Sequence, residues 1–142
     1  MKNLINEALV TKCGNATTTG TGTVDGTVLD MAGFDGVQFV TGIGTANAGN
    51  FVQVSQADNL AFNVGVEALD TKATPSSGDV VIIDVFQPSK RFVRCIVTKG
   101  VSSASDQITA FQYRVISEPV NNGQIDTRAG YTAIFKQSPA AA

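Results

Sequence analysis

The sequence contains no histidine and no tryptophan, and it has only two cysteines and two tyrosines. Without histidine, the chain can build no Ser-His-Asp triad, no Cys-His pair and no zinc site with a His ligand. Charged residues make up 15% of the chain, against roughly 25% in an ordinary soluble domain. The formal charge of −2 also argues against a general nucleic-acid binder, because such affinity comes mostly from neutralised phosphates. We therefore expect neither an enzyme nor a nucleic-acid partner.

Long hydrophobic runs are missing too. No apolar stretch approaches the roughly 18 residues that a membrane-spanning helix needs. The N-terminal segment carries one early lysine, Lys2, but Asn6 and Glu7 interrupt the apolar run that a signal peptide requires. We expect a protein without a membrane partner, made in the cytoplasm and soluble there unless a larger assembly carries it out.

The two cysteines, Cys13 and Cys95, form no CxxC pair and are too few for a disulfide framework. Cys95 lies within the run 91–97, which is typical of a buried strand. We interpret Cys95 as a small core hydrophobe. The sequence does not decide whether Cys13 and Cys95 form a disulfide.

Short apolar runs fill most of the chain, separated by clusters of Gly, Asn, Asp, Ser and Pro, whereas long helix-period stretches are absent. This pattern is typical of strands joined by turns. About eight such runs at this spacing favour a β-sandwich or barrel over βαβ units. The predicted strands cover 4–13, 22–31, 37–42, 50–56, 62–68, 80–86, 92–98 and 108–117.

The clearest local prediction is a hairpin in which 80–86 pairs with 92–98 across the loop 87–91. In this register one face is wholly apolar, as a core face should be, and Asp84 lies opposite Arg94 on the other face. The apolar face consists of Val81, Ile83, Val85, Val93, Cys95 and Val97.

The second face of this hairpin is also mostly apolar around its one charge pair. Either another part of the chain covers it, or it is an exposed patch that marks an interface. Its apolar members are Val80, Ile82, Phe86, Phe92 and Ile96.

Changes in composition along the chain predict three regions. These are an N-terminal strand or arm with a Thr/Gly link (1–20), a β-sandwich domain (21–118), and a C-terminal strand or arm with a frayed tail (119–142). In the C-terminal region, apolar and aromatic residues occur at intervals along a polar segment and could act as anchors. It is either a final strand or an arm that lies on a neighbouring subunit, where main-chain pairing supplies affinity and the anchors supply register. The candidate interface residues of this region are Tyr131, Ile134 and Phe135.

The only local concentration of positive charge is formed by Lys90, Arg91, Arg94 and Lys99, and Phe92 is its only aromatic residue. It is either a solvated hairpin end or a contact with an acidic protein surface, where Arg gives forked hydrogen bonds to carboxylates. One aromatic residue is too few for a nucleic-acid stacking platform. Lys90, Arg91, Phe92 and Arg94 therefore join the candidate interface residues.

The carboxylates often lie beside turn glycines, as at Asp25 and Asp35, and we interpret them as turn residues. Nothing in the sequence concentrates them into a catalytic pair or a calcium loop. The glycine pairs within 20–22 and 42–44 continue into neither GxGxxG nor GK[ST]. We predict no catalytic residue, no cofactor and no metal.

The segment 29–45 reads LDMAGFDGVQFVTGIGT and contains the pattern D-x-x-G-F-D-x-V-x-F followed by G-x-G-T. The next apolar run, 51–59, reads FVQVSQADN, with Gln53, Ser55 and Asp58 near its end. With these two segments, the chain resembles the cementing (decoration) proteins that bind the outside of tailed-bacteriophage capsids. The resemblance covers residues 22–118 and leaves out both ends of the chain.

The resemblance implies a jelly-roll-like antiparallel β-sandwich of about eight strands with extended terminal arms. It further implies a homodimer on the outer capsid surface of the virion, with the major capsid protein as partner. A protein that binds the mature shell preferentially stabilises it by mass action. The alternative is a receptor- or carbohydrate-binding β-sandwich module of a phage tail or fibre. Its aromatic platform would be thin, because Tyr113 and Tyr131 are the only tyrosines.

Overall fold

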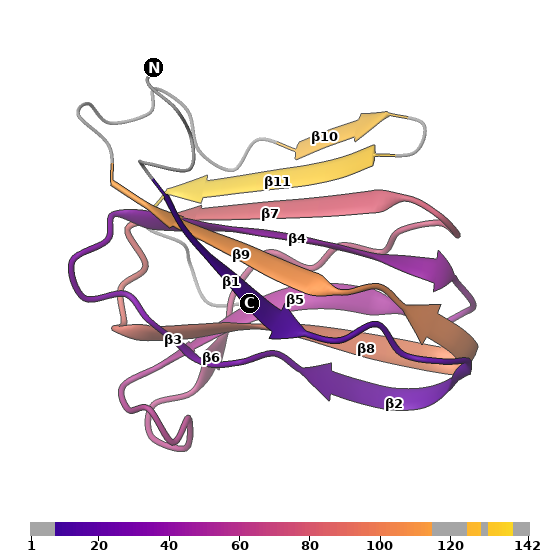
Figure 1. The fold of residues 1–142 in the computed structure, drawn as a ribbon, viewed down its shortest axis with the longest axis horizontal. Helices are drawn as coiled ribbons and strands as arrows, with labels where there is room; N and C mark the ends of the chain where they lie inside the picture. Colours follow the sequence, from indigo (N-terminus) through magenta and orange to yellow (C-terminus); the bar gives the residue numbers. More distant parts are fainter. Residues whose placement is uncertain (1–7, 115–124, 129–130, 138–142) are drawn as a thin grey trace.

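The computed structural model describes residues 8–114, 125–128 and 131–137. These residues form strands, turns and loops, and they include no helix that is long and apolar enough to cross a membrane. Figure 1 shows the strands, which are β1 (Ala8–Gly14), β2 (Gly20–Asp25), β3 (Leu29–Asp30), β4 (Gly36–Thr45), β5 (Phe51–Ala57), β6 (Glu67–Ala68), β7 (Val80–Phe86), β8 (Phe92–Ser105), β9 (Ile108–Tyr113), β10 (Ile125–Arg128) and β11 (Tyr131–Gln137).

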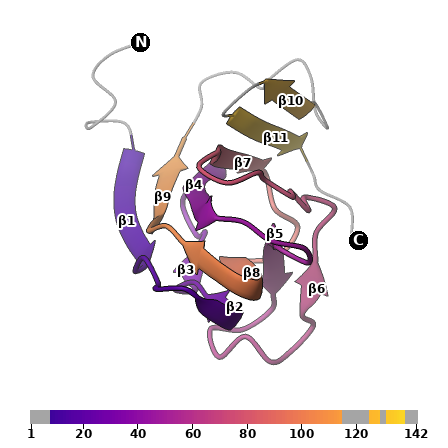
Figure 2. The ribbon, with the colours of Figure 1, turned by 90° about the vertical axis from the view of Figure 1, so that its right-hand side faces the viewer.

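The strands form two layers, which are seen from the end in Figure 2. The first layer, the β4 sheet, has the order β10-β11-β7-β4-β9-β1. The second layer, the β8 sheet, has the order β6-β5-β8, and β2 and β3 also pair with β8. The two layers join at one corner, where Ile43 at the end of β4 pairs with Ser105 at the end of β8.

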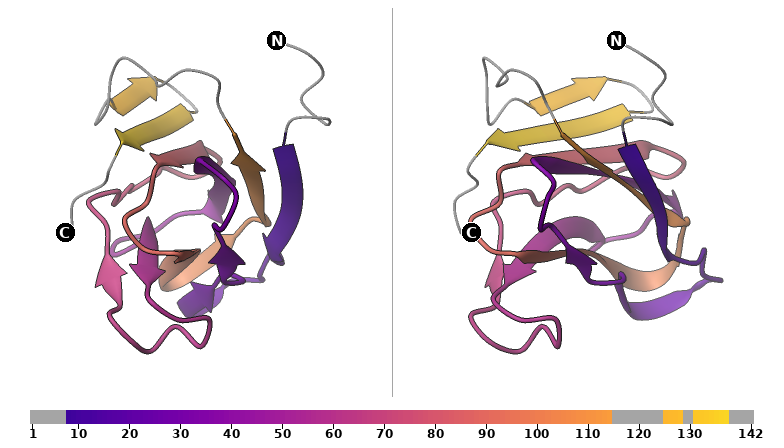
Figure 3. Two further views of the ribbon diagram at one scale, coloured as in Figure 1. Left: turned by 90° about the vertical axis from the view of Figure 1, so that its left-hand side faces the viewer. Right: turned by 60° about the vertical axis from the view of Figure 1, so that its left-hand side comes forward.

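The strand pairing is nested, because β1 pairs with β9, β2 with β8, β4 with β7, and β5 with β6. The resulting orders, β1-β9-β4-β7 and β2-β8-β5-β6, are those of a double ribbon rolled into a jelly roll. The predicted jelly-roll-like sandwich is therefore confirmed. Figure 3 shows β11 and β10 extending the β4 sheet beyond β7. Because β11 lies parallel to β7, this sheet is not wholly antiparallel.

The core lies between the two sheets and is built from alternate residues of the long strands. The six residues predicted as one apolar face are all fully buried there. Each fully buried Val or Ile side chain contributes about 1.5–3 kcal/mol relative to exposure. Other members of the core are Cys13, Leu29, Met31, Val37, Phe39, Ile43, Val52, Val54, Leu69, Ala73, Ile108, Ala110 and Ile134.

The predicted hairpin between 80–86 and 92–98 is wrong. Strand β7 pairs with β4 and β11, whereas β8 pairs with β5 and with β2 and β3. The two strands lie in opposite sheets, and their apolar faces meet across the core instead of side by side in one sheet. Alternation of apolar residues determines which face of a strand is buried, but it does not identify the neighbouring strand.

Strands β4 and β8 extend beyond their predicted ends, to Thr45 and Ser105, and two other predicted strands are largely lost or divided. The segment 62–68 is mostly loop and ends in the two-residue strand β6. The segment 22–31 is divided into β2 and β3, with an interruption at Gly26. A Cβ atom at Gly26 would lie 2.5 Å from the carbonyl oxygen of Cys95, so the chain passes the β8 backbone too closely for a side chain.

Both ends of the described chain belong to the β4 sheet. Within 1–20, β1 is the strand that pairs with β9, and within 119–142, β11 pairs with β7. Ile134 lies opposite Ile83 and is only 4% exposed, so its side chain packs in the core of its own chain. The frayed tail was predicted within 119–142, and the last residues of that region, 138–142, lie outside the described residues.

Both cysteines are free and buried, so the bridge that the sequence left open is not formed. Cys13 is 3% exposed, and Cys95 is fully buried, which confirms its interpretation as a core residue. Burial raises the pKa of the Cys13 thiol to about 11 and raises the pKa of Cys95 further still. Thiols in this state are poor nucleophiles.

Candidate interaction surface

Three loops meet at the end of the sandwich that lies on the left of Figure 1: 31–35, 58–66 and 87–91. Backbone hydrogen bonds tie the first loop to the third. The Met31 amide donates to the Arg91 carbonyl at 2.8 Å, and the Gln87 amide donates to the Asp35 carbonyl at 2.7 Å. We call this region the loop end, and it contains Lys90 and Arg91 of the predicted basic cluster.

Lys90 connects the second and third loops. Its ammonium lies 3.3 Å from the Asp58 carboxylate and 3.7 Å from the Glu67 carboxylate, and it donates a hydrogen bond to the Gly65 carbonyl. The Lys90 side chain is only 17% exposed. Its charge is therefore neutralised within the chain and helps to hold the loop 58–66 in place.

Gln56, which the sequence analysis did not single out, lies fully buried beneath Lys90. Its side-chain oxygen accepts a hydrogen bond from the Lys90 amide at 3.3 Å. Its side-chain nitrogen donates to Glu67 at 3.0 Å and to Ser89 at 2.7 Å. A buried amide that makes these bonds fixes the relative positions of two loops.

The loop 58–66 is also closed on itself by Asn59. The Asn59 side-chain oxygen accepts hydrogen bonds from the amides of Asn63 and Val64, both at 3.1 Å. The Asp58 amide donates to the Val64 carbonyl at 2.9 Å. Asn side chains commonly bond to nearby backbone in this way, which favours a loop over a strand.

Phe62 anchors this loop to the sandwich. Its side chain is 7% exposed, and the Arg94 guanidinium lies over its ring at 4.3 Å from the centroid. The φ of Phe62 is 58°, which is an uncommon conformation for an aromatic residue and persists only where the surroundings hold it. Arg94 thus stacks on Phe62, and the predicted Asp84–Arg94 pair is wrong.

The anchored loop displays three apolar side chains to solvent. Leu60 is 63% exposed, Val64 is 54% exposed and Val66 is 50% exposed. Single exposed apolar residues are ordinary on protein surfaces, but three on one ordered loop form a local patch. We call Leu60, Val64 and Val66 the loop patch. This patch was not predicted, although Asn59, Asn63 and Gly65 are a signal for a loop.

The other members of the predicted basic cluster also have partners within the chain. Arg91 donates two hydrogen bonds to the Asp30 carboxylate, both at 2.8 Å, and this contact lowers the pKa of Asp30 to about 2. The Arg91 guanidinium lies 5.2 Å from the centroid of the half-buried Phe92 ring. Lys99 donates to the Thr17 hydroxyl at 3.1 Å. Of the four positive charges that suggested an acidic partner, those of Lys90 and Arg91 are therefore paired with carboxylates of this chain.

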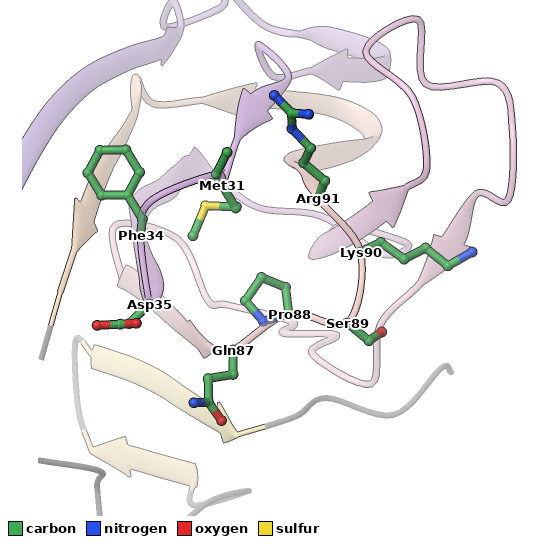
Figure 4. Close-up of a pocket in the computed structure, with 9 residues that line it drawn as sticks. Met31, Phe34, Asp35, Gln87, Pro88, Ser89, Lys90 and Arg91 are labelled. Carbon is green, nitrogen blue, oxygen red and sulfur yellow. The ribbon is translucent and has the colours of Figure 1, made fainter.

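A cavity of about 420 Å³ lies between the loops 31–35 and 87–91. In Figure 4, Met31 and Pro88 point toward it, whereas the side chains of Lys90 and Arg91 extend away from it. Its volume lies within the roughly 300–1,000 Å³ that is usual for small-molecule sites. The cavity is lined by Met31, Ala32, Phe34, Asp35, Gln87, Pro88, Ser89, Lys90 and Arg91.

A second apolar surface covers the outer face of the β4 sheet. Val10 is 48% exposed and Val80 is 42% exposed, whereas Val40, Ile82 and Phe111 are half-buried. Register partners across adjacent strands share one face of a sheet, and these residues share the outer face. On β11, Tyr131 is the register partner of Val80, and Phe135 is the register partner of Asp84.

This outer face only partly matches the predicted second face of the hairpin. Val80 and Ile82 belong to it, but Phe86 is only 1% exposed. Phe92 and Ile96 belong to the other sheet. The prediction that these five residues form one patch is therefore wrong, because the two strands belong to different layers.

A polar group lies within the outer face. The Tyr113 hydroxyl donates a hydrogen bond to the Asp84 carboxylate, and the Gln38 side-chain amide donates to it at 3.4 Å. Burial raises the pKa of Asp84, although these two hydrogen bonds lower it. Burial together with the Asp84 charge raises the pKa of Tyr113.

Residues 8–114, 125–128 and 131–137 contain no group of three or more His, Cys, Asp or Glu side chains that is placed to hold a metal ion. Comparison of the chain with protein families, with curated proteins and with solved structures finds no match in any of the three. Function must therefore be argued from the loop patch, the cavity and the outer face of the β4 sheet.

Proposed function

We propose that this chain is a non-enzymatic structural protein that binds the outer surface of a tailed-phage capsid and stabilises it by linking neighbouring major capsid subunits. The proposal rests on the loop patch, in which an ordered loop exposes three apolar side chains to solvent. A strained Phe62 and the contacts of Lys90 maintain that loop. An exposed apolar patch on an ordered loop is typical of a surface that a protein partner covers.

The segment that resembles cementing proteins has a structural role in this fold. Gly33 has a φ of 85°, Phe39 is 1% exposed in the core, and Gly36 lies beneath the Tyr113 ring. Asp30 pairs with Arg91 at the loop end. The resemblance thus rests on residues that build the jelly roll, an architecture that viral capsid proteins share with lectins and cupins. Since fold alone does not imply function, the surfaces decide between these classes.

A protein that links two subunits needs two contact surfaces, and this chain offers two. The loop patch lies at one end of the sandwich, and the outer face of the β4 sheet lies on one of its layers. In this proposal, the outer face pairs with a second copy of the chain, in keeping with the expected homodimer. The loop end then contacts the shell.

The stabilisation follows from binding linkage. A protein that binds the mature shell more tightly than the immature or disrupted shell shifts the equilibrium toward the mature form. A gain of only a few kcal/mol at each site adds up over the many equivalent sites of a symmetric shell. No bond-making chemistry is required of the chain.

Reconstitution tests the proposal. Bare mature shells of the major capsid protein from the same genome are mixed with the purified chain and separated on a density gradient. We expect the chain to sediment with the shells up to a fixed ratio and to raise the temperature at which they disrupt. A chain that stays at the top of the gradient, with unchanged shell stability, would contradict the proposal.

The cavity of about 420 Å³ favours the second candidate, a receptor- or carbohydrate-binding module. Met31 and Pro88 supply apolar walls, and the polar residues Asp35 and Gln87 also line the cavity, a combination that small-molecule sites share. Glycan-array screening followed by an NMR titration tests this function. Saturable shifts at the cavity residues, together with no shell binding, would favour this candidate over the first.

A further inference from the structure

We infer that the chain docks on the shell through the loop 58–66, which inserts Leu60, Val64 and Val66 into an uncharged apolar recess of a major capsid subunit. This inference rests on the proposed function, and it names the contacting element and the chemistry of the partner surface. It differs from the expectation that the basic residues contact an acidic surface.

The first step of the argument is that the loop is organised before it binds. Asn59 closes it internally, Phe62 anchors it under Arg94, and Lys90 holds Gly65 from the neighbouring loop. Binding by a pre-organised loop loses less conformational entropy than binding by a mobile one. The three exposed side chains can therefore contribute most of their burial energy to affinity.

The second step concerns charge. Asp58 and Glu67 are the carboxylates at the base of the loop, and both lie within 4 Å of the Lys90 ammonium. The Arg94 guanidinium lies over Phe62. The Asp58 and Glu67 side chains are 52% and 40% exposed, and the Lys90 ammonium already compensates part of their charge. A charged group on the partner would therefore gain little attraction from them and would lose its own hydration in the contact. The surface that fits the loop patch is therefore apolar and uncharged.

The third step is a consequence for ionic strength. Contacts between exposed charges weaken when salt screens them, whereas burial of apolar surface does not weaken in this way. Docking by the loop patch should therefore change little with added sodium chloride. Docking by the predicted basic cluster would weaken strongly under the same conditions.

The test uses a variant that combines Leu60→Ser, Val64→Thr and Val66→Thr in the full chain. All three positions are at least half exposed, so the variant should fold, and a matching unfolding transition checks this. The matched control is Val101→Thr, because Val101 is 71% exposed near the far end of β8. Affinity for bare shells is measured by gradient sedimentation at low and high sodium chloride, and the mass of the free protein is measured by light scattering.

We expect the wild type and Val101→Thr to bind shells equally well at both salt concentrations. The triple variant should bind at least about tenfold more weakly, because burying three apolar side chains contributes at least that much. Triple-variant binding equal to wild type, or wild-type binding that salt abolishes, would overturn the inference and leave the proposed function standing. A lower mass of the free triple variant would also overturn it, since the patch would then bind a second copy. Wild-type protein that does not bind shells would instead refute the proposed function.

Discussion

The Tyr113 hydroxyl donates its hydrogen bond to Asp84 across the backbone of Gly36. Tyr113 belongs to β9 and Asp84 to β7, while Gly36 belongs to β4, the strand between them. The aromatic ring can cross the middle strand because Gly36 has no side chain there. This contact joins three strands on the outer face of the β4 sheet.

Replacing Gly36 with alanine should disrupt this crossing. A Cβ atom at Gly36 would lie 2.5 Å from the Tyr113 ring and hydroxyl, so Tyr113 would have to move away from Asp84. We expect Gly36→Ala to lower the free energy of unfolding by about 1–3 kcal/mol, through steric crowding and the loss of the hydrogen bond. Urea denaturation measures the change.

Gly20→Ala is the matched control, because the nearest atom to a Cβ atom there is the Lys99 Nζ at 3.9 Å. It should change the free energy of unfolding by no more than about 0.5 kcal/mol. If both variants are equally stable, Tyr113 does not depend on the space above Gly36.

A pH dependence follows from Asp84. Its folded-state pKa is raised from the ordinary value of 3.8, chiefly by burial. The folded protein therefore binds this proton more tightly than the unfolded chain does. Ionised Asp84 destabilises the fold above its folded-state pKa, and this penalty disappears as the pH falls below the ordinary value.

Asp84→Asn removes the charge but keeps an acceptor for Tyr113. We expect the variant to be more stable than the wild type near pH 7, with an advantage that shrinks as the pH falls through the pKa of Asp84. Urea denaturation at a series of pH values tests this. A difference between the two proteins that is independent of pH would show that the Asp84 charge is not destabilising.

The two thiols should be unreactive in the folded protein. Cys13 and Cys95 are buried, and burial raises both pKa values, that of Cys13 to about 11. We expect a thiol reagent such as DTNB to label the native protein only as fast as it unfolds, and to label both cysteines promptly in urea. Rapid labelling of either cysteine without urea would contradict the placement of that residue in the core.

Lys90→Met should loosen the loop 58–66 without unfolding the sandwich. It removes the hydrogen bond to Gly65 and the ion pairs with Asp58 and Glu67. We expect amide hydrogen exchange within the loop to become about tenfold faster, while the free energy of unfolding falls by only about 1 kcal/mol.

Lys72→Met serves as the control for this prediction, since the Lys72 ammonium lies over Phe51 and not against the loop. Its exchange rates within 58–66 should equal those of the wild type. Unchanged exchange in Lys90→Met would show that Lys90 does not hold the loop.

The sequence alone predicted which residues of β7 and β8 face the core, because alternation is a local property of each strand. It could not predict that the two strands lie in opposite sheets, since pairing depends on long-range packing. Charge complementarity suggested Arg94 as the partner of Asp84, whereas the actual partners are the neutral side chains of Gln38 and Tyr113.

The loop patch was the largest omission. Val64 and Val66 alternate with Gly65 and Glu67, and this alternation suggested a strand over 62–68. In the structure, hydrogen bonds from the backbone to Asn59 close the segment into a loop. The alternation favoured a strand, whereas the hydrogen bonds to the Asn59 side chain favour a loop, and the segment forms the loop.

The central claim is that this protein belongs to a capsid shell in many copies, and its abundance in purified particles tests that claim most directly. If the proposal holds, quantitative mass spectrometry of phage particles purified from the source of this sequence gives the ratio of this chain to the major capsid protein. The account predicts a ratio near one or a simple fraction of it, as a symmetric shell requires. Absence of the chain from particles, or only the few copies that a tail or portal holds, would contradict the account.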